Sequence, residues 1–66
     1  MENQIRERRA AAGMRQEDLA RLVGVSRQTI ISVESGRYNP SLTLAWKLSR
    51  ALGGSIEDLF VFQEGD

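Results

Sequence analysis

Residues 16–35, with the sequence QEDLARLVGVSRQTIISVES, decide the fold of this chain. Apolar side chains recur at helical spacing in the first half: Leu19, Ala20 and Val23. Gly24 follows the last of them, and glycine readily adopts the left-handed backbone that ends a helix. Ser26 is a favourable N-cap for a second helix. The stretch therefore predicts two short helices, at 16–23 and 27–35, joined by a tight turn.

The same residues also predict how the two helices cross. Ile30 and Val33 are three residues apart and would point inward from the second helix. Ala20 is small, which allows two helices to approach closely, and Val25 would fill the corner between them. This pattern is the layout of a helix-turn-helix, so it specifies an angle between helices as well as the helices themselves.

The rest of the chain predicts three more helices, over 3–12, 42–52 and 56–60. Phe60-Val61-Phe62 alternates like a short strand, so the chain would end in a short extended tail. We expect an all-α, five-helix, repressor-like domain that occupies residues 1–66 as a single unit. Its predicted core comprises Ile5, Met14, Leu19, Ala20, Val23, Val25, Ile30, Val33, Leu42, Ala45, Leu48, Leu52, Ile56 and Leu59.

The composition excludes several classes of protein. The chain has no cysteine and no histidine, which removes disulfides, thiolate metal sites and the commonest general base. No apolar run reaches the roughly 20 residues that a transmembrane helix needs, and no signal-peptide pattern opens the chain. We therefore expect a small cytoplasmic protein that is not an enzyme, with no membrane contact, cofactor or metal.

The net charge is zero, but the charges are unevenly distributed along the chain. Residues 1–50 contain nine basic and five acidic side chains, whereas residues 51–66 contain four acidic side chains and no basic one. Eight of the nine basic residues are arginine, which suits bidentate contact with phosphate and guanine. A basic front could bind nucleic acid while the acidic end faces away from it.

Four motifs carry a resemblance to a known family. In chain order they are GMRQEDLA at 13–20, VSRQTI at 25–30, ESGR at 34–37 and NPSL at 39–42. With this order and spacing, the chain closely resembles the xenobiotic-response-element (Cro/CI) family of phage-repressor-like helix-turn-helix regulators. The resemblance covers about residues 3–60. It implies a five-helix fold that binds a two-fold DNA operator, usually as a dimer.

The chain departs from the family pattern at two positions. Arg15 stands where the family usually has threonine or serine, so the second helix would lose a side-chain cap that contributes about 1 kcal/mol. Arg15 also adds a positive charge close to the expected DNA. Gly54 replaces a usual β-branched residue before Ser55, which would loosen the last connection.

The outer face of the third predicted helix carries the candidates for reading bases: Arg27, Gln28 and Ser32. Arginine can bond O6 and N7 of guanine, and glutamine can bond N6 and N7 of adenine. Such side chains on an isolated helix would more often form only a solvated face. Within a helix-turn-helix we expect them to contact DNA in the major groove.

Candidates for contact with the DNA backbone lie at the starts of helices and in the loop after the third helix. Helix N-termini favour phosphate, because their first N–H groups are free and the helix dipole attracts anions. The predicted set is Arg15, Gln16, Ser26, Thr29, Arg37, Tyr38, Asn39 and Ser41. Thr29 could instead assist the helix cap, and Asn39 could serve only the turn before Pro40.

Arg9 and Glu34 are predicted to form a structural ion pair. Arg9 lies on the same helix face as Ile5, and Glu34 follows the core residue Ile30 by four positions. Both charges are thus directed inward, where an unpaired charge is very costly. The matching positions are paired in the family that the chain resembles.

Apolar side chains near the end of the chain exceed what so small a core needs. We expect a dimer interface built on residues 55–63 and the single tryptophan, comprising Trp46, Leu59, Phe60, Val61 and Phe62. The alternative is that the tail folds back and buries Trp46 within one subunit.

Together these features predict a sequence-specific regulator of transcription that binds double-stranded DNA. We expect a repressor that binds an inverted-repeat operator as a homodimer. Two alternatives remain open: an antitoxin-type regulator that also holds a protein partner, and a protein-interaction module without DNA binding.

Overall fold

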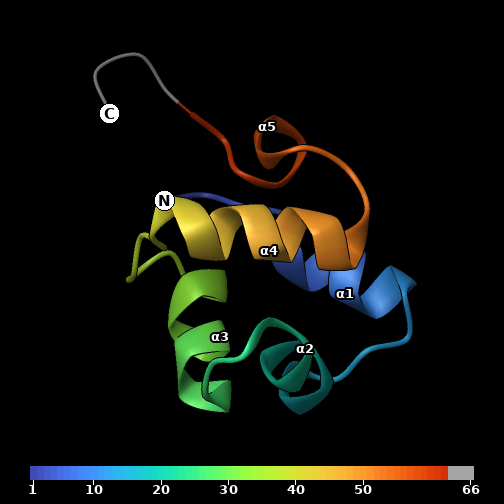
Figure 1. Ribbon diagram of the computed structural model, residues 1–66. Helices are drawn as coiled ribbons and strands as arrows, with labels where there is room; N and C mark the ends of the chain where they lie inside the picture. The colour runs from blue at the N-terminus through green and yellow to red at the C-terminus, as the bar shows by residue number, and fades with distance from the viewer. Residues whose placement is uncertain (63–66) are drawn as a thin grey trace.

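The computed structural model describes residues 1–62, and these form five helices. In chain order they are α1 (Ile5–Ala11), α2 (Gln16–Val23), α3 (Arg27–Glu34), α4 (Leu42–Leu52) and α5 (Ile56–Leu59). Helix α4 crosses the middle of the molecule, with α2 and α3 on one side of it and α5 on the other (Figure 1). The predicted all-α, five-helix fold is confirmed.

The turn between α2 and α3 forms as its residues dictate. Gly24 ends α2 in the left-handed region, with φ at 76°. Ser26 then caps α3, because its Oγ accepts a hydrogen bond from the backbone N–H of Thr29 at 3.1 Å. Ser41 caps α4 in the same way, by accepting a bond from the N–H of Leu44 at 3.1 Å.

The first and last predicted helices are shorter than expected, because the two ends of the chain pair with each other. The N–H of Gln4 donates to the carbonyl of Leu59 at 2.8 Å, and the N–H of Val61 donates to the carbonyl of Glu2 at 2.9 Å. An antiparallel bridge joins Asn3 and Phe60. These bonds require extended backbone, so α1 begins only at residue 5 and α5 ends at residue 59.

The core lies where these helices meet, and most of its predicted members are buried: Ile5, Leu19, Ala20, Val23, Ile30, Val33, Ala45, Leu48 and Leu59. Four others pack partly buried against them: Met14, Val25, Leu52 and Ile56. The prediction for Leu42 was wrong, since this side chain is 78% exposed. Leu44, not Leu42, shares the inner face of α4 with Ala45 and Leu48, and Phe60 is a further core residue.

None of the helices over residues 1–62 combines the length and the apolar character that a bilayer span requires. In the same part of the chain, no three acidic side chains gather closely enough to hold a metal ion.

Candidate nucleic-acid interface

Packing of α3 against the core determines which of its side chains face outward. Ile30 and Val33 are buried, so the helix has one fixed orientation. Gln28 and Ser32 are one turn apart on the side that faces away from these anchors, with Gln28 exposed and Ser32 half-buried. Arg27 is exposed at the first position of the helix. The three predicted base-reading residues therefore share the accessible surface of α3.

The start of α3 carries two hydroxyl groups that bond to each other. The Oγ atom of Ser26 lies 3.0 Å from Oγ1 of Thr29, in addition to accepting the Thr29 N–H. Thr29 therefore assists the cap of α3, which is one of the two roles predicted for it; the other is contact with a DNA phosphate. Ser26 is exposed and Thr29 half-buried, so both lie at the edge of the surface that Arg27 begins.

The loop after α3 continues this surface. The N–H groups of Arg37 and Tyr38 donate to the carbonyl of Ser32 at 3.1 and 3.2 Å, which holds the loop against the end of α3. Arg37, Tyr38, Asn39 and Ser41 are all exposed. The loop thereby extends the outer face of α3 toward the start of α4.

Gly36 is needed at the start of this loop for two reasons. Its φ is +81°, a backbone conformation that side chains with a Cβ rarely adopt. A Cβ at this position would also lie 3.1 Å from the carbonyl oxygen of Met1. The amino group of Met1 in turn donates to the carbonyl of Gly36 at 2.8 Å.

Arg15 precedes α2 and is engaged by the helix's own carboxylates. Its Nε atom lies 3.3 Å from Oδ2 of Asp18 and 3.6 Å from Oε1 of Glu17. The hydrogen bond and charge of Asp18, followed by the charge of Glu17, raise the pKa of Arg15. The Arg15 N–H also donates to Oδ2 of Asp18 at 2.9 Å, and this bond is the main reason that the pKa of Asp18 lies below its ordinary value. A phosphate would compete with these two carboxylates for Arg15.

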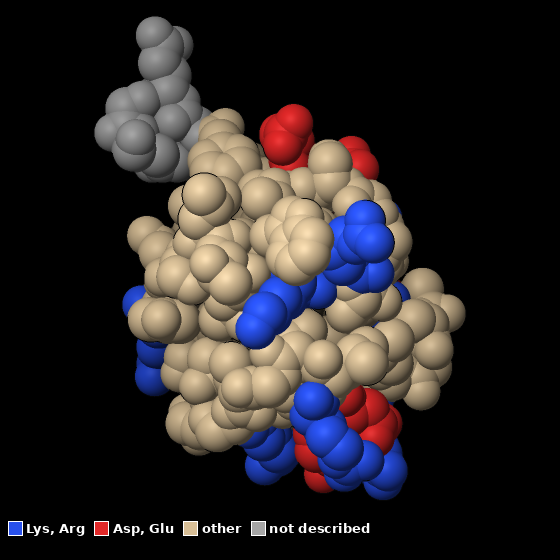
Figure 2. Space-filling model, viewed as in Figure 1, with Lys and Arg blue, Asp and Glu red and all other residues tan. Residues whose placement is uncertain are grey.

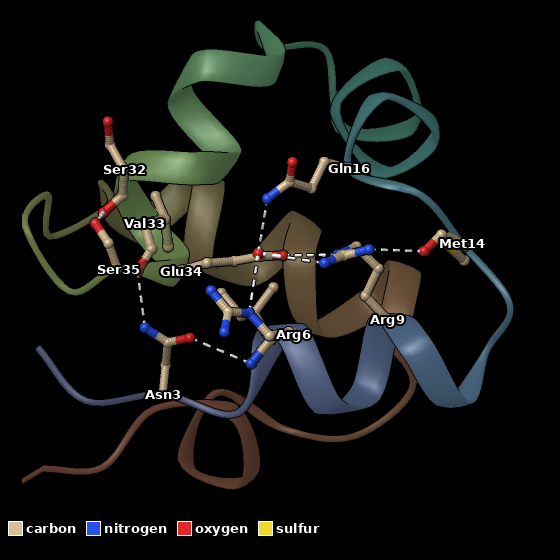
Figure 3. Close-up of polar contacts among 10 residues, drawn as sticks. Asn3, Arg6, Arg9, Met14, Gln16, Ser32, Val33, Glu34 and Ser35 are labelled. Carbon is tan, nitrogen blue, oxygen red and sulfur yellow. Dashed lines mark hydrogen bonds and ion pairs between the residues drawn. The ribbon is translucent and has the colours of Figure 1, made fainter.

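Glu34 is the centre of a buried polar cluster that joins three helices (Figure 3). Its side chain is only 1% exposed. Nε of Arg9 donates to one carboxylate oxygen at 2.7 Å, and Nη2 donates to the other at 3.3 Å. Arg9 also donates to the carbonyl of Met14 at 2.9 Å, and Nε of Arg6 lies 3.9 Å from Glu34. The predicted Arg9–Glu34 pair is therefore present.

The sequence did not reveal that Gln16 belongs to this cluster. Its Nε2 atom donates to Oε1 of Glu34 at 3.1 Å (Figure 3). The buried carboxylate of Glu34 therefore orients the Gln16 side chain, which is predicted to contact the DNA backbone. Gln16 is the first residue of α2, and its position between the core and the surface is fixed by this bond. Glu34 thus connects the ion pair in the core to the candidate interface.

Two arginines of this surface differ from the others in having no acidic partner among the described residues. Within residues 1–62, Arg27 and Arg37 have no carboxylate at ion-pair distance, whereas Arg9 and Arg15 do. Their guanidinium groups are available to an external anion. Arginine presents several N–H donors in a planar fork that matches phosphate and the O6/N7 edge of guanine.

The predicted dimer residues divide into two groups. Trp46 and Phe62 are 54% and 57% exposed, and Val61 is half-buried. Leu59 and Phe60 are instead fully or almost fully buried in the core, so their assignment to an interface is corrected. The bridge to Asn3 explains this, because it draws the start of the tail onto the N-terminal segment. Residue 63 of the predicted dimerisation element lies outside the described residues.

The exposed part of this region forms one apolar face on α4 and α5. Leu42, Trp46 and Ile56, together with Thr43, line a shallow hollow of about 340 Å³. The guanidinium of Arg50 lies 5.6 Å from the centre of the Trp46 ring. The exposure of Trp46 contradicts the alternative in which the tail folds over it. We call the surface formed by the exposed side chains of Leu42 and Trp46 and the half-buried side chain of Ile56 the α4 face.

Comparisons with known proteins agree with this architecture. A family model described as helix-turn-helix matches residues 5–59. An uncharacterized HTH-type transcriptional regulator of Archaeoglobus fulgidus is 55% identical over 64 residues, which cover 97% of this chain and 91% of that protein. Another such regulator, from Methanocaldococcus jannaschii, is 47% identical over 66 residues, which cover the whole of both chains.

Solved structures give the same result. The restriction-modification controller protein C.AhdI from Aeromonas hydrophila superposes with a TM-score of 0.79 at 42% identity, over 86% of each chain. A structure of a SinR protein/SinI protein complex matches with a TM-score of 0.76 at 29% identity, over 82% of this chain and 53% of that one.

Proposed function

The chain belongs to the helix-turn-helix family of DNA-binding transcriptional regulators, and on that premise we propose that it binds operator DNA sequence-specifically through α3. As a member of this family it is a regulator and not an enzyme. We place its action in the cytoplasm, on double-stranded DNA. We also propose that it represses transcription, in line with its resemblance to the phage-repressor-like helix-turn-helix regulators.

The observation that carries this proposal is the continuous exposed surface of α3 and its following loop. Arg27, Gln28 and Ser32 would reach base edges in the major groove. Arg37 and the residues around it would meet phosphates on one side of the groove, and Arg15 and Gln16 would meet them on the other. Both kinds of contact are supported by Arg27 and Arg37, which have no carboxylate at ion-pair distance within residues 1–62.

We further propose that the protein binds its operator as a homodimer that associates through the α4 face, with Val61 and Phe62 as further members of the interface. An exposed apolar patch of this kind usually marks an interface. The α4 face lies on a different helix from the base-reading residues, so association would leave α3 free. A two-fold dimer would place two copies of α3 about 34 Å apart, and the operator would be an inverted repeat.

The first test is selection of bound sequences from a randomised duplex pool at near-physiological salt. We expect enrichment of an inverted repeat whose half-site spacing reports the dimer geometry. Arg27→Ala should then weaken binding to the selected operator by about 1–3 kcal/mol and relax the preference at one base position. Arg21→Ala, an exposed arginine outside the proposed interface, is the matched control. If no sequence is enriched and duplex DNA is ignored even at low salt, the proposal fails.

A second candidate function follows from the α4 face and the SinR–SinI relative. The solved structure of that relative is a complex of two proteins, and this chain exposes an apolar face that a protein partner could also cover. The chain would then be a regulator whose DNA binding is controlled by a partner on the α4 face. Sedimentation distinguishes the two: a single-chain mass at tens of micromolar excludes the homodimer and favours the partner.

A further inference from the structure

A hollow lies between the α2–α3 turn and the first turns of α4. It has a volume of about 310 Å³. Its polar lining comprises Thr29, Tyr38, Ser41, Thr43 and Lys47. Three of these, Thr29, Tyr38 and Ser41, belong to the set predicted to contact the DNA backbone. The hollow is therefore an edge of the candidate interface, and it brings Thr43 and Lys47 into that edge.

Lys47 is the only basic residue that lines this hollow, and no carboxylate lines it. In the described part of the chain, Lys47 has no carboxylate at ion-pair distance, whereas Arg9 and Arg15 have such partners. The side chain is exposed on α4, one turn beyond Thr43. A flexible ammonium group with three donors can bind a phosphate as a compact point charge, without the fixed geometry that a guanidinium requires.

We propose that Lys47 binds a DNA phosphate at the outer edge of the interface and so extends the DNA contact onto the second turn of α4. This inference rests on the proposed function, since it assigns a further ligand contact to the same DNA-binding surface. The ligand is a phosphodiester of the strand that passes the α3–α4 loop. The sequence did not suggest this role, because Lys47 lies outside every motif and only the fold brings α4 beside Thr29.

A competing location for Lys47 is the neighbouring hollow of about 680 Å³, which Trp46 and Arg50 also line. Lys47 lines both hollows, so it stands at the boundary between two surfaces. Basic side chains gather across the middle of the face shown in Figure 2. Arg50 is already placed over the Trp46 ring, whereas Lys47 has no such contact. The polar lining and the three shared backbone-contact residues assign Lys47 to the DNA side.

The test measures the affinity of the full chain for its selected operator between about 50 and 200 mM salt, for Lys47→Ala, Lys47→Arg and the wild type. A lost phosphate contact lowers the slope of log K against log salt by about one, equally for every operator sequence. We expect this change for Lys47→Ala, and we expect Lys47→Arg to retain the wild-type slope. Arg50→Ala removes the same charge from the same helix outside the hollow, and it should leave the slope unchanged.

The possible results separate this inference from the function on which it rests. A wild-type slope for Lys47→Ala, with operator binding intact in the wild type, overturns the Lys47 contact alone. A change confined to self-association, measured by sedimentation, also overturns it and assigns Lys47 to the Trp46 side. If the wild-type chain does not bind duplex DNA at all, the proposed function itself fails.

Discussion

The Glu34 cluster and the α4 face use their side chains in opposite ways. Glu34 is 1% exposed, yet every side-chain polar atom buried in residues 1–62 has a hydrogen-bond partner. On the α4 face the apolar side chains of Leu42 and Trp46 are more than half exposed. The first region buries charged side chains, and their bonds fix the angles between α1, α2 and α3. The second leaves apolar surface outside, where only another molecule can bury it.

The largest effect should come from breaking the Glu34 cluster. Glu34→Ala leaves the guanidinium of Arg9, whose side chain is 14% exposed, without its partner. Removing one member of a buried pair costs about 3–5 kcal/mol, which is a large part of the stability of a small domain. Urea unfolding followed by circular dichroism measures the loss. Glu17→Ala removes a half-exposed carboxylate from α2 and should change stability by less than about 1 kcal/mol.

The double variant Arg9→Met/Glu34→Leu sharpens this result. Apolar side chains of similar size can replace a buried ion pair with little loss or even a gain of stability. If the double variant recovers stability but binds the operator more weakly, the cluster serves to orient Gln16, which donates to Glu34 at 3.1 Å. If the urea midpoint of Glu34→Ala equals that of the wild type, the ion pair contributes nothing to stability and the contrast between the two regions disappears.

Breaking the α4 face should affect association more than folding. Trp46→Ala removes a large exposed aromatic side chain, and central interface residues of this kind contribute about 2 kcal/mol or more, roughly a 30-fold change in the dimer dissociation constant. Sedimentation equilibrium measures this constant. Tyr38→Ala, an exposed aromatic in the α3–α4 loop, is the matched control and should leave self-association unchanged. Equal association constants for Trp46→Ala and the wild type would contradict the proposed dimer.

The two regions also differ in how far the sequence predicts them. The helix-turn-helix followed from local signals that act over a few residues: Gly24 to end α2, Ser26 to cap α3, and apolar spacing to orient both. The Arg9–Glu34 pair followed because two charges on inward faces must meet. These inferences need only helix geometry, and the structure contains each of these features.

What the sequence missed depends on contacts between distant segments. The pairing of residues 2–4 with 59–61 buried Phe60 and shortened α1 and α5, and no local pattern encodes it. Leu42 and Leu44 are both leucines near the start of α4, and only the packing of α4 decides which of them faces the core. Within the candidate site, the bond from Gln16 to Glu34 and the position of Lys47 required the tertiary fold for the same reason.

A smaller effect should come from repairing the cap of α2. Arginine has no side-chain acceptor, so Arg15 cannot accept the N–H of Asp18 as threonine would. Arg15→Thr should therefore stabilise the protein by about 1 kcal/mol, measured by urea unfolding. The same change removes a cation from the proposed interface, and operator binding should become less salt-dependent by about one unit of slope. A loss of stability would show that the ion pairs of Arg15 with Glu17 and Asp18 outweigh the missing cap.

The smallest effect concerns the start of α5, beside the α4 face. Oδ2 of Asp58 accepts the N–H of Ser55 at 2.9 Å, and Oγ of Ser55 accepts the N–H of Asp58 at 3.2 Å. The backbone bond from Ser55, then its side-chain bond, holds the pKa of Asp58 below the ordinary 3.8. A lowered pKa in the folded state means that the unfolded chain takes up the proton first.

The contribution of Asp58 to stability is therefore complete above about pH 4 and is lost as the pH falls toward its folded-state pKa. Asp58→Asn should reduce the fall in stability over this range, when unfolding is compared between pH 5 and pH 3. Oδ2 of Asp18 likewise accepts the N–H of Arg15 at the start of α2, and the pKa of Asp18 is lowered too. Asp18→Asn should therefore act in the same direction, and the two changes together should reduce the fall further. An unchanged acid profile in the double variant would show that these two carboxylates are stabilised equally in the unfolded chain.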